Sequence, residues 1–390
     1  MAVVNSPAFQ INIVAPATGL PAWYTAATSG RWVAVPGSTF SASSAFTAAA
    51  AAGLSAYGFG NARYVIEAWN SGVMNTVGVF HSGSFVPGAF LVVWGGGHGD
   101  YAGNEVYAFG PLQSATPTWR MLYNPTIPPP SNVARGANNF PVSRHTYDAL
   151  AYIASTNKML SAGAGSVYQL GGANNWTDIY DFNVNPVSGA PWTPLSDVST
   201  GGAYSTRQQA VCVDPVAGKV FMFARATSLN VFDVATQTWS VRAGALSSLD
   251  WGNATAAMDP GSKVAVLYNG SDGGVARYWA VDLRSWQTSL PIYTIAASGA
   301  PSGLASIDFD PRTNKFVAWV EGRTLHYLTP PANPFQASGW AWSTVAPSAG
   351  DDPSVPHSQG TFRRFGVMPT ALPGYYVMPR YDQPVYIYKP

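Results

Sequence analysis

The stretch Val213-Asp-Pro-Val-Ala-Gly-Lys-Val-Phe-Met-Phe223 decides the fold of this 390-residue chain. An apolar segment meets Asp-Pro, a short polar turn follows, and Lys opens a second apolar segment. Pro fixes φ at the second position of a turn, and the Asp before it bonds the backbone of that turn. The pattern therefore predicts a β-hairpin. It recurs at Met258-Asp-Pro-Gly-Ser-Lys-Val-Ala-Val-Leu-Tyr268 and Phe309-Asp-Pro-Arg-Thr-Asn-Lys-Phe-Val-Ala-Trp319, with looser copies at 154–160 and 368–376.

A second hairpin follows each first one. Its clearest form is Val231-Phe-Asp-Val-Ala-Thr-Gln-Thr-Trp239, and a near copy spans 279–286. Each copy predicts a third strand, a turn, and a fourth strand that opens on a tryptophan. Four strands per repeat with one aromatic anchor are typical of a β-propeller blade. The predicted fourth-strand tryptophans are Trp119, Trp192, Trp239, Trp286 and Trp342.

The two ends of the chain predict how the ring closes. Five repeats end on those tryptophans, whereas a sixth, from about Thr361, ends at Val385-Tyr-Ile-Tyr388 without a fourth strand. The segment Gly30-Arg-Trp-Val-Ala-Val-Pro36 has the form of the missing strand. Pairing it with the last repeat leaves no open sheet edge. We predict an all-β fold, a six-bladed propeller of four-stranded antiparallel blades whose last blade is closed by the N-terminal strand.

The predicted domain organisation is one propeller over 1–390, since all-β units often reach this length. Residues 1–60 form an N-terminal segment that contains the closing strand 30–36. The blades are expected at about 61–122, 144–195, 203–242, 251–290, 301–345 and 360–390, with the first and last the least regular.

The spacing Phe-Asp-x-x-Thr-x-x-Trp at Phe232 to Trp239, and Gly95-Gly96, resemble the Kelch repeat of propellers such as the central domain of galactose oxidase. The resemblance covers most of the chain from about residue 60. It implies the propeller fold but leaves the function open, because Kelch-like propellers include oxidases, sugar-binding proteins and interaction scaffolds. The oxidases use a tyrosine cross-linked to cysteine. Here the single cysteine, Cys212, lies in an apolar segment, so that activity is not expected.

Charge is scarce in this chain. Asp, Glu, Lys and Arg make up 10% of the residues and the net charge is +1, whereas about 25% is usual. We expect no nucleic-acid partner, because no basic field is available to hold one. The longest apolar stretch, Phe46 to Phe59, is too short to cross a bilayer, and no basic residue precedes Arg31 to form a secretion signal. A surface this neutral is either solvated by small polar groups or covered by neighbouring subunits.

The densest polar motif is Trp94-Gly-Gly-Gly-His-Gly-Asp-Tyr-Ala-Gly-Asn-Glu-Val-Tyr107. A second, Ser143-Arg-His-Thr-Tyr147, is predicted to begin the innermost strand of the second blade and to face the channel. Oxygen and imidazole groups of both motifs would then converge at one channel mouth as a ligand site. Alternatively, the first is a plain loop whose side chains bond their own turn, and the second bonds a neighbouring blade. The candidate ligand-binding residues are His98, Asp100, Asn104, Glu105, Arg144 and His145, with no catalytic residue, metal or cofactor assigned.

Function follows less directly than fold. We predict a non-enzymatic structural or recognition protein, a component of a bacteriophage virion in its tail or tip. The grounds are the missing secretion signal, the scarcity of charge, the single cysteine and the aromatic-rich β architecture. The predicted fold also resembles the propellers in the tail nozzles of podoviruses. It would be made in the host cytoplasm, act in many copies with other virion proteins, and contact a host-surface glycan. Two alternatives stay open. One is a carbohydrate-binding protein or carbohydrate-active enzyme with its site at the channel mouth, and the other is a cytoplasmic Kelch-like interaction scaffold.

Overall fold

The structure is a computed structural model. Within the part of the chain that it describes, no helix is long and apolar enough to cross a membrane. The described residues are 20–57, 63–67, 69–97, 101–131, 133–136, 139–163, 167–169, 175–198, 205–225, 228–243, 246, 254–269, 277–354, 356, 358 and 360–390.

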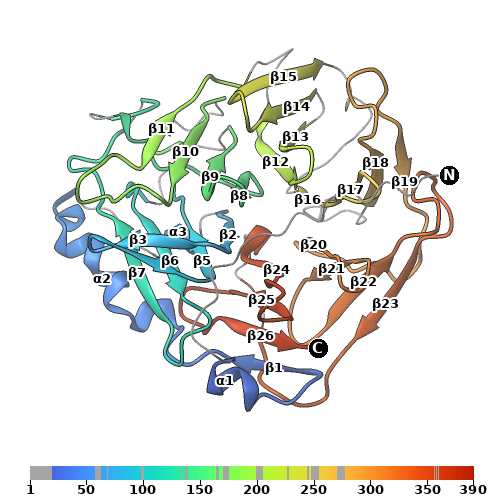
Figure 1. The fold of residues 1–390 in the computed structure, drawn as a ribbon, viewed down its shortest axis with the longest axis horizontal. Coiled ribbons are helices and arrows are strands. Elements are labelled where there is room, and N and C mark those ends of the chain that lie inside the picture. The colour runs from blue at the N-terminus through green and yellow to red at the C-terminus, as the bar shows by residue number, and fades with distance from the viewer. Residues whose placement is uncertain are drawn as a thin grey trace, which may run out of the picture.

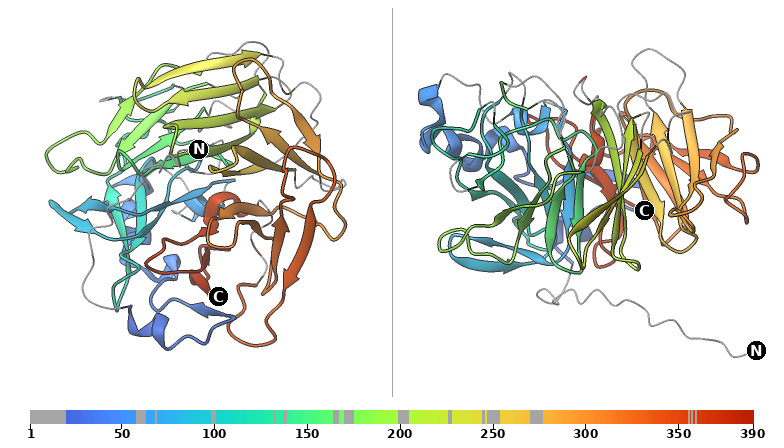
Figure 2. Two further views of the ribbon diagram at one scale, coloured as in Figure 1. Left: turned by 45° about the vertical axis from the view of Figure 1, so that its right-hand side comes forward. Right: turned by 90° about the horizontal axis from the view of Figure 1, so that it is seen from above.

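Six four-stranded antiparallel sheets stand around a central axis, each with its first strand innermost (Figure 1). The predicted six-bladed propeller is confirmed, and Figure 2 shows the same ring tilted and edge-on. Blade 1 consists of β2 (Gly72–Asn75), β5 (Phe90–Val93), β6 (Val106–Gly110) and β7 (Thr118–Tyr123). Blade 2 consists of β8 (Leu150–Ile153), β9 (Lys158–Ser161), β10 (Asp178–Asp181) and β11 (Trp192–Pro194). Blade 3 consists of β12 (Ser205–Asp214), β13 (Lys219–Arg225), β14 (Ser228–Asp233) and β15 (Thr238–Ala243). Blade 4 consists of β16 (Ala254–Asp259), β17 (Val264–Asn269), β18 (Arg277–Asp282) and β19 (Ile292–Thr294). Blade 5 consists of β20 (Ser306–Asp310), β21 (Lys315–Trp319), β22 (Leu325–Thr329) and β23 (Ala341–Val345). Blade 6 consists of β24 (Phe365–Val367), β25 (Tyr375–Val377), β26 (Tyr386–Lys389) and β1 (Arg31–Ala34).

The N-terminal strand closes the last blade, as the sequence predicts. Strand β1 pairs antiparallel with β26, with Trp32 opposite Tyr388. Trp32 is 1% exposed and belongs to a buried cluster that joins blades 5 and 6 and includes Trp319. Its ring lies 5.6 Å from the Tyr388 ring, measured between centroids. Its indole N–H donates to the carbonyl of Arg323 over 2.9 Å. One tryptophan therefore anchors the closing strand to both of the blades that it touches.

The outer edge of β1 is also covered. The carboxylate of Asp351 accepts a hydrogen bond from the Ala34 N–H at 2.7 Å, and the Asp351 N–H donates to the Trp32 carbonyl at 3.1 Å. These contacts take up backbone groups that an edge strand would otherwise offer to another chain.

Blade 1 carries additions that the repeat pattern does not predict. The hairpin β3 (Gly78–His81) and β4 (Ser84–Pro87) is inserted between β2 and β5. Helix α2 (Ser44–Ala51) of the N-terminal segment lies on the outside of this blade next to β7, whereas α1 (Ala22–Thr25) lies beside β1 (Figure 1). Further short helices are η1 (Phe40–Ala42) and η2 (Leu54–Tyr57), which contact α2, α3 (Tyr64–Glu67) before β2, and η4 (Phe362–Arg364) before β24.

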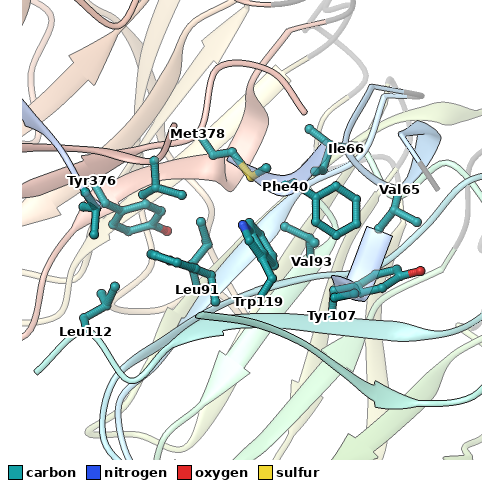
Figure 3. Close-up of a cluster of buried hydrophobic side chains, with 14 of the residues drawn as sticks. Phe40, Val65, Ile66, Leu91, Val93, Tyr107, Leu112, Trp119, Tyr376 and Met378 are labelled. Carbon is teal, nitrogen blue, oxygen red and sulfur yellow. The ribbon is translucent and has the colours of Figure 1, made fainter. Parts of the chain in front are cut away.

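Aromatic side chains form the contacts between blades. Trp94 of blade 1 meets Trp192 of blade 2 with ring centroids 4.9 Å apart. Figure 3 shows the cluster at blade 1, where Phe40 from the N-terminal segment lies with Tyr107 and Trp119. The centroid distances from Phe40 to these two rings are 4.9 and 4.8 Å. Such edge-on pairs add to the free energy gained from burying the rings.

Two predicted strand starts differ from the structure. Trp286 does not open the fourth strand of blade 4, because the turn after β18 continues to Ser289, whose N–H donates to the Ser285 carbonyl, and β19 begins only at Ile292. In blade 2 the innermost strand begins at Leu150, after the motif 143–147. There Tyr147 adopts φ +45°, with its N–H bonded to the carbonyl of Trp69 at 2.7 Å, which interrupts the extended chain.

Replacing Trp32 tests the closure. We expect Trp32→Ala to lower the free energy of unfolding by about 3–5 kcal/mol, because a fully buried ring is lost and its cavity stays. Urea denaturation followed by tryptophan fluorescence and circular dichroism measures the change. The control is Phe85→Ala, at a side chain that is 36% exposed on the inserted hairpin. Equal effects of the two substitutions would contradict the closing role of Trp32.

Candidate functional site

The two polar motifs meet through their backbones. The Gly96 N–H donates to the Arg144 carbonyl at 3.0 Å, and the Gly97 N–H donates to the Ser143 hydroxyl at 3.0 Å. The structure therefore places the first motif of blade 1 beside the segment that leads into blade 2. His98 and Asp100 lie outside the described residues, so their part in the candidate ligand site stays a prediction.

Asn104 is 1% exposed, and its amide links three loop segments. Its Nδ2 donates to the Thr126 hydroxyl at 3.0 Å and to the Pro141 carbonyl at 2.9 Å. Its Oδ1 accepts from the Thr126 N–H at 2.9 Å. Because both the oxygen and the nitrogen of the amide are hydrogen-bonded to other loops, the side chain holds these loops together in this structure.

Glu105 is fully buried between two tyrosines. Its carboxylate accepts hydrogen bonds from the hydroxyls of Tyr101 and Tyr107, the latter at 2.9 Å. Burial raises the pKa of Glu105 above its usual value, and burial with the nearby carboxylate raises the pKa of both tyrosines. The Gly103 backbone lies so close that a Cβ there would meet Glu105 Oε2 at 2.3 Å. The two tyrosines belong to the buried cluster at blade 1.

Arg144 is fully buried and holds strands of its own blade together. Its Nη2 lies 2.6 Å from Asp178 Oδ2, and its Nη1 donates to the Trp176 carbonyl at 3.0 Å. Arg135 contacts the other oxygen of Asp178 at 2.8 Å. The guanidinium also lies over the Trp94 ring, 5.4 Å from its centroid. Arg144 thus pairs with β10 of its own blade and also contacts the neighbouring blade 1 through Trp94 and Gly96.

His145 lies beside aromatic rings. It is 3% exposed, with ring centroids 5.0 Å from Trp69 and 5.9 Å from Tyr147. The imidazole is thus part of the packing where blade 2 begins.

A different set of charged residues meets near the axis of the ring. Asp148 immediately precedes blade 2, and its carboxylate accepts a hydrogen bond from the Ala256 N–H of blade 4 at 2.9 Å. Arg363, from η4 before blade 6, lies with its Nε 3.1 Å from Asp148 Oδ1 and donates from Nη2 to the Ala256 carbonyl at 2.9 Å. We call this contact the axial ion pair. It joins three blades that are not neighbours in the ring.

A third charged residue, Asp308 of β20, lies close to the axial ion pair. Its Oδ2 accepts from the Val367 N–H at 2.8 Å, which links blade 5 to blade 6. Burial raises the pKa of Asp308, and it raises the pKa of Asp148 to about 7, although Arg363 acts in the opposite direction on both. The protein therefore concentrates charge in a place where ionisation is costly.

Asp308 and Arg363 lie at one end of a pocket of about 250 Å³, which we call the axial pocket. Asp308 and Arg363 are its charged lining residues, and Tyr376 is a polar one whose hydroxyl donates to the Arg363 carbonyl at 3.0 Å. The remaining wall comes from blades 1, 2, 3, 5 and 6 and is mostly apolar. Its side chains include Val73, Met74, Tyr152, Val213, Ile307, Phe365, Val367 and Met368. We take the axial pocket as the candidate functional site.

Sequence reasoning missed Asp148, Asp308 and Arg363. Asp148 directly follows the motif 143–147, and Asp308 stands directly before the Phe309 hairpin pattern. Both were therefore visible as acids within or just before an innermost strand. Within the described residues, no group of three or more His, Cys, Asp or Glu side chains is arranged to hold a metal ion. Cys212 is 2% exposed, and burial raises the pKa of its thiol.

No known protein family and no curated protein matches the sequence. Among solved structures, a chain of the COPII outer coat vertex is similar, with 12% identity and a TM-score of 0.46 over 76% of this chain and 65% of that one. The chain spans 36% of a second chain, from the COPII coat assembled on membranes. An auxiliary nutrient binding protein from Bacteroides ovatus has 10% identity and a TM-score of 0.45 over 82% of this chain and 76% of its own.

The β-propeller domain of Cps50 (Swd1) from Myceliophteria thermophila has 10% identity and a TM-score of 0.38, over 81% of this chain and 85% of that domain. These similarities concern the fold alone.

The pKa of Asp148 predicts how stability depends on pH. The Asp148 carboxyl keeps its proton up to about pH 7 in the folded protein, whereas an Asp in an unfolded chain loses its proton near pH 4. The protonated carboxyl therefore contributes to folding stability at low pH, and this contribution is lost as the pH rises from about 4 to about 7. We expect the wild type to lose on the order of 2 kcal/mol more than Asp148→Asn between pH 5 and pH 8. Urea denaturation at both pH values measures this, and parallel pH profiles would rule it out.

Proposed function

We propose that this protein is a non-enzymatic interaction scaffold. The observation that carries the proposal is its neutral surface, with 10% charged residues in the whole chain. Many of those charges are paired inside the protein. Asp178 lies with Arg135 and Arg144, Asp214 with Lys263, and Asp310 with Arg312. A protein with so little free charge lacks the repulsion that keeps copies apart.

The ring geometry supports the same role. Because β1 and β26 are neighbouring strands, the ends of the ring meet in blade 6, and blade 5 has β23 as its outermost strand. In β23 of blade 5, the exposed side chains are Ala341, Ser343, Thr344 and Val345, small groups without charge. Large apolar side chains are exposed elsewhere, with Val187 at 75% and Val216 at 68%. Such a surface suits contact with other proteins, whose interfaces are depleted of charge at the centre.

More specifically, we propose a bacteriophage virion component, in the tail or tip, present in many copies and made in the host cytoplasm. Its partners would be other virion proteins, and a host-surface glycan is a further candidate. The support is the combination of a neutral, β-rich surface with a ring whose last blade is closed by the N-terminal strand. This assignment is finer than the scaffold role and has its own test.

The scaffold role and the virion assignment are tested by separate measurements. Sedimentation equilibrium of the purified chain is expected to show self-association, and a stable monomer that binds no protein partner would remove the scaffold proposal. For the virion assignment, we expect the gene to lie among tail genes and the protein to be found by mass spectrometry in purified particles. A gene with no phage genes beside it would remove that assignment. Glycan turnover by the purified chain would favour the carbohydrate-active alternative.

A further inference from the structure

The axial pocket combines an apolar wall with a charged end. Its volume of about 250 Å³ corresponds to roughly eight water molecules at their share of liquid volume. Most of its lining side chains are aliphatic or aromatic, and Asp308 and Arg363 are the charged residues among them. Apolar walls hold water poorly, so the pocket suits a small molecule with an apolar body and one polar head.

At a pH high enough to ionise both acids, the charge balance at this end is negative. The Arg363 guanidinium is engaged by Asp148, 3.1 Å away, and by the Ala256 carbonyl. Asp148 and Asp308 are two carboxylates against this one guanidinium, which leaves one negative charge in excess when all three are ionised. A low-dielectric environment makes such an excess unfavourable, and a bound cation would remove the penalty.

Asp308 is the acid positioned to meet a ligand. It lines the pocket, whereas the Asp148 side chain is 1% exposed and lies behind Arg363. Each Asp308 oxygen accepts one backbone hydrogen bond, from the Phe309 N–H at 2.9 Å and the Val367 N–H at 2.8 Å. A carboxylate has about four acceptor sites, so this group retains the capacity to accept further donors. The rings of Phe365 and Tyr376 line the same pocket and can attract a cation with their faces.

We propose that the axial pocket binds a small organic cation, a protonated amine with an apolar body, through Asp308. A hard metal ion fits less well, because Ca²⁺ or Mg²⁺ needs about six oxygen ligands and the wall is mostly apolar. An anion is disfavoured by the excess negative charge. This ligand site goes beyond the proposed scaffold function and does not depend on it.

Three probes of one shape test the charge preference in the wild-type protein. Isothermal titration calorimetry at pH 8 compares benzylammonium, benzyl alcohol and benzoate. We expect benzylammonium to bind at least tenfold more tightly than benzyl alcohol, and benzoate to bind least. Equal affinity for the ammonium and the alcohol, tighter binding of benzoate, or no binding of benzylammonium would each overturn the proposal.

A substitution locates the site. Asp308→Asn is expected to remove the preference for benzylammonium over benzyl alcohol. The control Asp382→Asn, in a half-exposed pair with Arg380, is expected to keep it. Near-ultraviolet circular dichroism confirms that each variant is folded. If Asp308→Asn does not fold, a crystal of the wild type soaked in benzylammonium decides, since density for the amine away from Asp308 would overturn the proposal.

Discussion

The pairing of β1 with β26 is the constraint on which the rest of the structure depends. A propeller is held by side-chain layers between blades, and a three-stranded last blade would leave β26 as an open edge beside blade 5. Strand β1 fills that place, and Trp32 carries the contact to blade 5 through its ring and its indole N–H. Asp351 then covers the backbone of β1 from outside. The ring is therefore closed by β1, the first strand in the described part of the chain, which is the fourth strand of the last blade.

The inner side of the last blade is fastened by two consecutive arginines. Arg363 reaches toward Asp148 and Ala256, whereas Arg364 is fully buried and donates to the Asn70 carbonyl next to blade 1 and to the Met378 carbonyl in blade 6. Burial lowers the pKa of Arg364 to about 9. Backbone carbonyls are thus the partners that keep this cation inside the protein. Blade 6 is held from outside by β1 and from inside by these side chains.

The sequence predicted the blades because their signals are local. An Asp-Pro turn and a fourth strand with a tryptophan are each specified by a few residues that are adjacent in sequence. The segment around Trp32 could be assigned to the missing strand from its sequence pattern alone. Trp286 shows the limit, since the length of its turn depends on hydrogen bonds at Ser285. The axial site was not predictable in this way, because Arg363 and Ala256 are 107 residues apart and meet through the curvature of the ring. Likewise, Asn104 and Arg144 were recognisable as unusual polar residues, but their partners come from distant segments.

A disulfide placed across β1 and β26 tests the closure most directly. Arg31 and Lys389 are opposite each other in the pair, and directly opposed residues on antiparallel strands lie within disulfide reach. In the double variant Arg31→Cys, Lys389→Cys, mild oxidation is expected to link the two ends within one chain, as shown by mass spectrometry of the cleaved protein. Free thiols at both positions after oxidation of the folded protein would contradict a ring closed by its N-terminal strand.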